Sequence, residues 1–273
     1  MNILKKDILW FVLYGILITG AFLYLLFPSD LVKSKLEQSF AAYDYILKTE
    51  AIKPSLPLGL KLKEISVRSA SADSIPFQGK LLDLQFNPLS LFQKNKSFGF
   101  SGSAYGGSFK GRVGVASFSR FYPFQEGTLN LQDIDLGKYA FLKTLMEKEI
   151  SGKATGDLTY AAADKKSRSS GTISLVLHKG SYPLMEPLLG MNRIDFDIVE
   201  IKARLSDRSI ILEKFSVSGP QLKYSLSGEI ALADSFKESR LNLKGDLELL
   251  GPNKAKMKVT VVGTMKNPDL RYI

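Results

Sequence analysis

The sequence predicts a mainly β protein, in which an N-terminal transmembrane helix precedes a curled, mostly antiparallel β-sheet with a few short helices. Three observations lead to this fold class. An uncharged apolar run lies near the N-terminus, a helical amphipathic pattern follows it, and apolar residues then alternate with polar ones through most of the 273-residue chain. Alternation with period two is typical of strands that bury one face.

The composition describes a foldable chain and excludes several kinds of chemistry. The chain is 45% hydrophobic and 23% charged, which is ordinary for a globular protein. It has no cysteine and a single histidine, His178, so disulfides, thiolate zinc sites and two-histidine metal sites are excluded. The formal net charge of +10 favours anionic surfaces without specifying one.

Residues 8–27 contain no charge and are long enough to cross the hydrocarbon core of a bilayer. Lys5 and Lys6 precede this run, and Trp10 and Tyr24 lie near its two ends, where aromatic rings favour the membrane interface. By the positive-inside rule the short N-terminal end stays cytoplasmic and the rest of the chain is exported. We therefore expect residues 1–28 to be a cytoplasmic tip and a membrane anchor. A cleaved signal peptide is the alternative, but residues 27–30 offer no small-x-small cleavage site.

Residues 29–52 show a helical pattern. Apolar side chains recur at spacings of three and four, which places them on one face; they are Val32, Leu36, Phe40, Tyr43 and Leu47. This spacing predicts an amphipathic juxtamembrane helix that lies against the membrane surface or against the folded domain.

Residues 53–273 alternate as about a dozen strands, with short helices expected at 137–147 and 183–191. So few helices cannot cover the apolar face of so many strands, so we expect a barrel, a sandwich or an open trough. An open trough would need a ligand or partner, because proteins rarely leave a large apolar patch exposed. The residues expected to line an apolar groove are Leu60, Leu62, Leu84, Phe86, Leu129, Leu131, Leu226 and Ile230.

One short pattern recurs within these strands. Apolar residues at relative positions zero, two, five and seven occur in 60–67 and 129–136, and less cleanly in 210–217. The step of three predicts a β-bulge or a strand break at the acidic residue inside it, Glu64 or Asp133. Such an irregularity keeps the next apolar pair on the same face of the sheet.

The residues that could carry chemistry favour structural roles. The glycine-dense segment 99–114 lacks the Gly-Lys-Ser/Thr of a phosphate loop and alternates like a strand. Paired carboxylates at 133/135 and 195/197 could bind calcium or act as acid and base, but the pattern is more typical of a solvated strand face. Lys254, Lys256 and Lys258 are typical of a solvated edge strand. We expect no catalytic, cofactor-binding or metal-binding residues, no nucleic-acid partner and no enzymatic activity.

The order of these features resembles the protein N family of the type II secretion pathway (GspN). Besides the anchor and the helix after it, the resemblance rests on short motifs at 56–62, 89–92, 103–107, 129–136, 226–230, 239–243 and 262–268. The last of them, Val-Gly-Thr-Met-Lys-Asn-Pro, is also similar to the ending of AsmA-type envelope proteins, whose repeated β units form long open troughs associated with phospholipid movement.

This resemblance implies a single-pass protein of the bacterial inner membrane with its β-domain in the periplasm. It implies an accessory, structural component of the type II secretion system whose partners are other secretion-system subunits. The alternative is an AsmA-like module that binds or transfers envelope lipids and holds phospholipid acyl chains in a β-groove. The resemblance identifies no functional residue in this chain.

Overall fold

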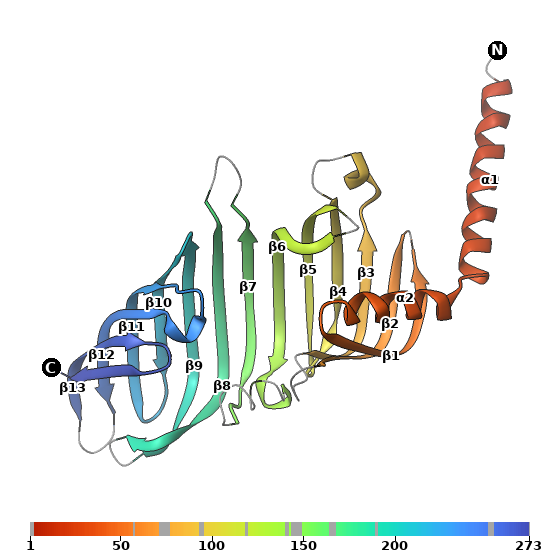
Figure 1. Cartoon of the computed structure of the whole chain (residues 1–273). Helices are drawn as coiled ribbons and strands as arrows, with labels where there is room; N and C mark the ends of the chain where they lie inside the picture. The colour runs from red at the N-terminus through yellow and green to blue at the C-terminus, as the bar shows by residue number, and fades with distance from the viewer. Residues whose placement is uncertain are drawn as a thin grey trace.

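A computed structural model gives the architecture of the chain (Figure 1). It describes residues 3–56, 58–70, 77–92, 96–117, 120–139, 142, 149–163, 168–188, 191–250 and 254–272. The helices are α1 (Ile3–Leu25) and α2 (Ser29–Ala41), with 3₁₀ turns η1 (Pro88–Phe92), η2 (Leu136–Lys138) and η3 (Phe236–Glu238). The strands are β1 (Tyr45–Ser55), β2 (Gly59–Ser69), β3 (Phe77–Phe86), β4 (Lys96–Ala104), β5 (Gly107–Ser117), β6 (Arg120–Asp135), β7 (Lys153–Ala161), β8 (Ser170–Leu188), β9 (Met191–Ser206), β10 (Ser209–Ser218), β11 (Leu222–Ala231), β12 (Arg240–Leu249), β13 (Ala255–Thr264) and β14 (Pro268–Tyr272).

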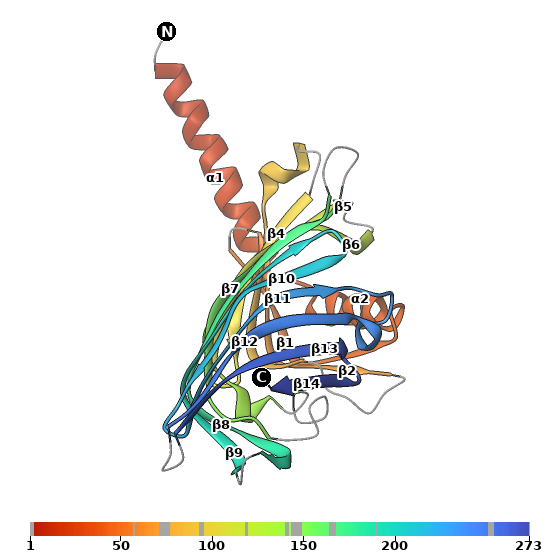
Figure 2. The same ribbon diagram turned by 90° about the vertical axis from the view of Figure 1, so that its left-hand side faces the viewer.

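All fourteen strands belong to one sheet, and their order in the sheet is their order in the chain. Each strand pairs antiparallel with the next, from β1–β2 to β13–β14. The mainly β, antiparallel expectation is therefore confirmed. Within the described residues the order starts at β1 and ends at β14, so the sheet is open, and Figure 2 shows it bowed along its strands.

The pairing register gives the sheet one apolar and one polar face. One row of directly opposed residues crosses all the strands and contains only apolar side chains and glycine: Ile52, Leu62, Leu82, Gly102, Phe109, Leu131, Gly156, Leu175, Ile201, Phe215, Leu226, Gly245, Val259 and Tyr272. The neighbouring row is polar from β1 to β10: Lys53, Lys61, Asp83, Ser101, Lys110, Asn130, Asp157, Ser174, Lys202 and Lys214. Because neighbouring residues of a strand point to opposite faces, one face is apolar across the whole sheet.

Helix α2 lies on this apolar face at the β1 end of the sheet (Figure 2). Its residues Val32, Leu36 and Phe40 pack against a cluster that includes the buried Leu62 and Ile65. The sequence pattern correctly assigned these three side chains to one helical face. The helix covers only the start of the sheet, because its thirteen residues contact β1 and the strands beside it.

The helix expected over 29–52 is too long. α2 ends at Ala41, and residues from Tyr45 onward form β1. Asp44 has a left-handed backbone with φ of 64°, which ends the helical path. Leu47 then pairs opposite Val67 and is buried, so pairing with a strand twenty residues away outweighs the local helical spacing.

Helix α1 stands apart from the sheet in both views (Figures 1 and 2). Across the residues that the structure describes, no helix combines the length and the apolarity that crossing a membrane requires. The transmembrane assignment of residues 8–27 stays a prediction from the sequence.

The two short helices expected at 137–147 and 183–191 have different outcomes in the structure. Residues 183–188 belong to β8, so no helix forms in that part of the segment expected over 183–191, of which 189 and 190 lie outside the described residues. Of the segment expected over 137–147, most lies outside the described residues, and its described start is the 3₁₀ turn η2.

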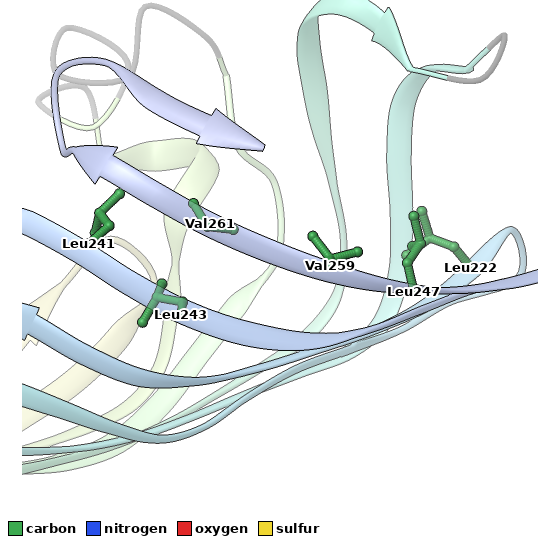
Figure 3. Close-up of a cluster of buried hydrophobic side chains, with 6 residues drawn as sticks. All are labelled: Leu222, Leu241, Leu243, Leu247, Val259 and Val261. Atoms are coloured by element: carbon green, nitrogen blue, oxygen red, sulfur yellow. The ribbon is translucent and has the colours of Figure 1, made fainter. Parts of the chain in front are cut away.

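Two packed clusters occupy the ends of the apolar face. The first, under α2, has Leu47, Ile52, Leu62 and Ile65 as its buried members. The second lies on the last strands and is drawn in Figure 3; its buried members are Leu222, Leu241, Leu243, Leu247, Val259 and Val261. The central strands lie between these clusters, where no helix of comparable length covers them in the described part of the chain.

Candidate ligand-binding hollow

A hollow of about 860 Å³ lies on the apolar face between the two clusters. Nine strands, β3 to β11, and the η2 segment contribute its walls. We call this space the hollow; its lining residues are Phe77, Phe100, Ala104, Tyr105, Phe109, Leu129, Leu131, Ile134, Leu136, Tyr139, Leu142, Ile150, Ala154, Leu175, Leu177, Tyr182, Ile194, Phe196, Val199, Ile201, Phe215, Val217 and Tyr224. A volume of this size is typical of small-molecule sites.

The lining is hydrocarbon and aromatic. None of these described lining residues carries a charge, and the four tyrosine hydroxyls are its only side-chain polar groups. Four hydroxyls are too few to replace the water around a charged or strongly polar ligand, and polar groups of a ligand that stay unpaired lose their hydration without compensation. The hollow therefore suits an apolar ligand.

Aromatic rings form a connected wall at the β3–β5 side. Phe77 meets Phe109 edge to face at a centroid distance of 5.8 Å, and Phe109 lies 6.2 Å from Phe100. The Tyr105 and Tyr139 rings are 4.8 Å apart. Offset and edge-on rings at these distances attract one another beyond their burial, so they give this wall a defined shape.

Burial disfavours the ionisation of three of the tyrosine hydroxyls. Burial raises the pKa of Tyr105, and this is partly offset by the hydrogen bond that the backbone N–H of Gln78 donates to its hydroxyl oxygen over 2.6 Å. Burial also raises the pKa of Tyr139, and it raises that of Tyr224 to about 12. These raised pKa values keep the three hydroxyls uncharged at neutral pH.

β-Bulges concentrate apolar side chains on this face. Asp133 has a φ of 53°, and the β6–β7 register shifts between Leu131 and Ile134. Both Leu131 and Ile134 consequently line the hollow. The bulge predicted at the acidic position of the 129–136 repeat is confirmed.

Glycines let rings lie flat against the sheet. Gly102 sits opposite Phe109, and a Cβ on Gly102 would lie 2.7 Å from the Phe109 Cζ atom. Real carbon atoms do not approach this closely, so a larger residue would push the ring into the hollow. The glycine-dense segment 99–114 is accordingly the β4–β5 hairpin, and Gly102 and Gly111 within it make room for aromatic side chains.

The groove residues expected from the sequence divide between four places. Leu129 and Leu131 line the hollow. Leu60, Leu62 and Leu84 belong to the cluster under α2, and Leu226 and Ile230 pack against the cluster on the last strands. Phe86 is exposed at the end of β3, where its ring is 6.4 Å from that of Phe98.

The expected anchor residues all lie in α1. Trp10 and Tyr24 are exposed, whereas the side chains of Lys5 and Lys6 lie outside the described residues.

Sequence reasoning missed the aromatic wall. Phe100, Phe109 and Phe196 lie in segments recognised as alternating strands, so a search for aromatic residues within them would have found these three. Tyr105 follows the end of β4 and Tyr139 follows the 3₁₀ turn η2. Both reach the hollow through the folding of the chain, which the local sequence pattern does not reveal.

The candidate chemical groups have structural partners. The Asp135 carboxylate accepts a hydrogen bond from the Gly137 N–H at 3.1 Å and lies 3.4 Å from Lys138 Nζ. Asp195 lies 3.0 Å from Arg193 Nε. Over the described residues, no group of three or more histidine or acidic side chains could hold a metal ion.

No family model, no curated protein and no solved structure matches the chain. The hollow itself is therefore the starting point for a function.

Proposed function

We propose that the protein is a membrane-anchored lipid-binding module whose hollow holds acyl chains. The observation that carries this proposal is an open hollow of about 860 Å³ with no charged side chain among its described lining residues. Each methylene group moved from water into such surroundings contributes about 0.8 kcal/mol, so an acyl chain gains affinity along its length. The proposal assigns no reaction to the protein.

The shape of the site supports a lipid ligand. The apolar rows run across all fourteen strands, and the walls leave one side open. An acyl chain can lie in such a trough while its charged headgroup stays in water. The headgroup stays outside because burying an unpaired charge is costly. Because the tyrosine hydroxyls are the only polar side-chain groups among the described lining residues, we expect selection for the apolar chain and not for the headgroup.

The proposed location follows from the N-terminal sequence. Residues 8–27 would anchor the protein in the bacterial inner membrane, with Lys5 and Lys6 on the cytoplasmic side and the sheet in the periplasm. The anchor would keep the trough next to a lipid source.

Native mass spectrometry of the full chain, released gently from membranes, tests the proposal. We expect phospholipid to remain bound to the wild-type protein. Leu175→Asp places a carboxylate in the hollow, and Ser174→Asp places one on the polar face one residue away. Lipid loss with Leu175→Asp but not with Ser174→Asp, at unchanged circular dichroism, supports acyl binding. Lipid-free wild-type protein contradicts it.

A second candidate function is an accessory structural role in type II secretion. One observation favours it: β14 is an open edge whose described residues are all exposed, and such an edge can pair with a strand of another protein. A photo-crosslinking residue at Leu270 should then capture a secretion-system subunit in cells. Capture that persists after Leu175→Asp would separate this role from lipid binding.

A further inference from the structure

The two ends of the strands differ in what they expose. Leu56 and Leu58 at the β1–β2 turn, Leu89 in η1, Phe124 near the start of β6 and Tyr160 near the end of β7 are all exposed. Pairing of Ser55 with Gly59, Phe86 with Phe98 and Gly127 with Tyr160 places them at the same end of the sheet. We call this set of five the rim.

At the opposite end, the exposed large hydrophobic side chains of the described residues gather at the start of β1, where they are Tyr43, Tyr45 and Ile46. The described residues of the β4–β5, β6–β7, β8–β9 and β10–β11 connections expose no large hydrophobic side chain. The exposed apolar side chains of the rim therefore extend over more strands than those at the opposite end, and turns in general do not expose them. An exposed apolar patch of this kind marks an interaction surface.

The rim is long and narrow. It extends over β1 to β7, which at the usual strand spacing is roughly 29 Å. Its side chains come one or two at a time from successive turns instead of gathering in one pocket. Lys96 and Arg168 lie at the same strand ends. Apolar and aromatic side chains at these strand ends lie along a line and have basic side chains beside them. This composition and shape suit binding to the interface of an anionic bilayer.

The direction of α1 points to the same partner. In Figures 1 and 2 the N-terminal end of α1 and the η1 segment project to the same side of the sheet. α1 exposes Trp10, Phe11 and Leu17, so a membrane that takes up α1 would meet the rim.

We propose that the rim docks on the bilayer that α1 enters, with Leu56, Leu89 and Phe124 inserted at the interface. An apolar row of Phe86, Phe98, Val113, Gly127 and Tyr160 crosses the sheet beside the rim. The next apolar row includes Phe100 and Leu129, which line the hollow. Docking would thus place the bilayer at one end of a continuous apolar path. The inference rests on the α1 anchor of the proposed function. It does not depend on which ligand occupies the hollow.

Because the chain has no cysteine, a single introduced thiol is the only thiol to which a fluorescent probe can attach. The full chain is reconstituted in phosphatidylethanolamine–phosphatidylglycerol vesicles, with a polarity-sensitive probe attached after Leu89→Cys, Phe124→Cys, Leu17→Cys or His178→Cys. Leu17 reports on the anchor, and His178, exposed in β8 near the opposite end, is the matched control. Nitroxides on the lipid tails quench probes that reach the bilayer.

We expect quenching at position 89 to exceed that at 178 several-fold, with a blue-shifted emission. Adding Leu56→Asp and Leu89→Asp should reduce quenching of a probe at position 124 while quenching at 17 persists. Equal quenching at 89 and 178, or none at 89 while 17 is quenched, overturns the docking and favours a protein partner for the rim. If only the probe at position 17 is not quenched, the anchor of the proposed function is overturned. The docking of the rim is then judged from the quenching at position 89.

Discussion

Leu131 and Ile134 lie three positions apart in β6, yet both line the hollow. In an unbroken strand they would point to opposite faces. The left-handed backbone of Asp133 between them takes up one residue and returns Ile134 to the apolar face. Glu64 also has a left-handed backbone, with φ of 46°, between Leu62 and Ile65 of the cluster under α2, but the registers of β2 with β1 and β3 do not shift there, so the bulge expected at Glu64 does not form. Asp133 is thus a backbone element of the apolar face.

Replacing Asp133 tests this role. Asp133→Val should lower the free energy of unfolding by about 1–2 kcal/mol, because a β-branched residue resists a left-handed backbone. Asp133→Gly should be neutral or stabilising. Urea unfolding of the full chain measures both, and Gln132→Val, in the adjacent extended position, is the control. Equal losses from Asp133→Val and Gln132→Val would contradict the assignment.

Gly102 provides a test of the aromatic wall. A Cβ at this position would lie 2.1 Å from the Leu81 carbonyl oxygen and 2.7 Å from Phe109 Cζ, so Gly102→Val should cost about 3 kcal/mol of stability through overpacking against both the β3 backbone and the ring. Gly99→Val, in the same strand, meets no atom closer than 3.7 Å and should change stability little. Thermal unfolding compares them. A tolerated Gly102→Val would show that Phe109 is free to move.

The packing of α2 can be measured independently of the hollow. Leu36 packs against the cluster under α2, so Leu36→Ala should reduce the free energy of unfolding by about 2 kcal/mol. Gln38→Ala, on the exposed side of the same helix, should have almost no effect. Faster amide hydrogen exchange in β1 should accompany only the first change. If both variants unfold alike, α2 does not contribute to the core.

High pH should reveal the burial of Tyr224. Burial raises its folded-state pKa to about 12 from an ordinary value of 10.0. Its contribution to stability is complete below the unfolded pKa and is lost as pH rises through the folded one, because only the unfolded chain ionises readily in between. Stability should therefore fall between about pH 10 and pH 12, and less steeply in Tyr224→Phe. Identical pH profiles would mean that the hydroxyl titrates as in water.

Local sequence pattern was enough to predict the antiparallel sheet and the bulge at Asp133. Alternation of residues such as Leu129 and Leu131 records which face is buried, and the step of three records the irregularity. Both signals lie within a few residues of the sequence, so they can be detected without knowing which strands pair.

Other features depend on contacts between distant segments. Leu47 joins β1 because it pairs with Val67, although its spacing from Tyr43 is helical. Leu62 and Leu129 have the same local pattern, yet α2 packs near the first and the hollow opens over the second. Where the sheet is covered and where it is open is decided by tertiary packing, so the pattern left trough, sandwich and barrel as alternatives.

Photo-crosslinking with a phospholipid that carries a diazirine in its acyl chain tests the central claim most directly. After reconstitution and irradiation of the full chain, mass spectrometry locates the adducts. Acyl chains in the hollow predict adducts on peptides that contain Leu131, Leu177 or Phe196, and their loss in Leu175→Asp. Adducts confined to α1 and the rim, with none on the lining of the hollow, would contradict acyl binding there.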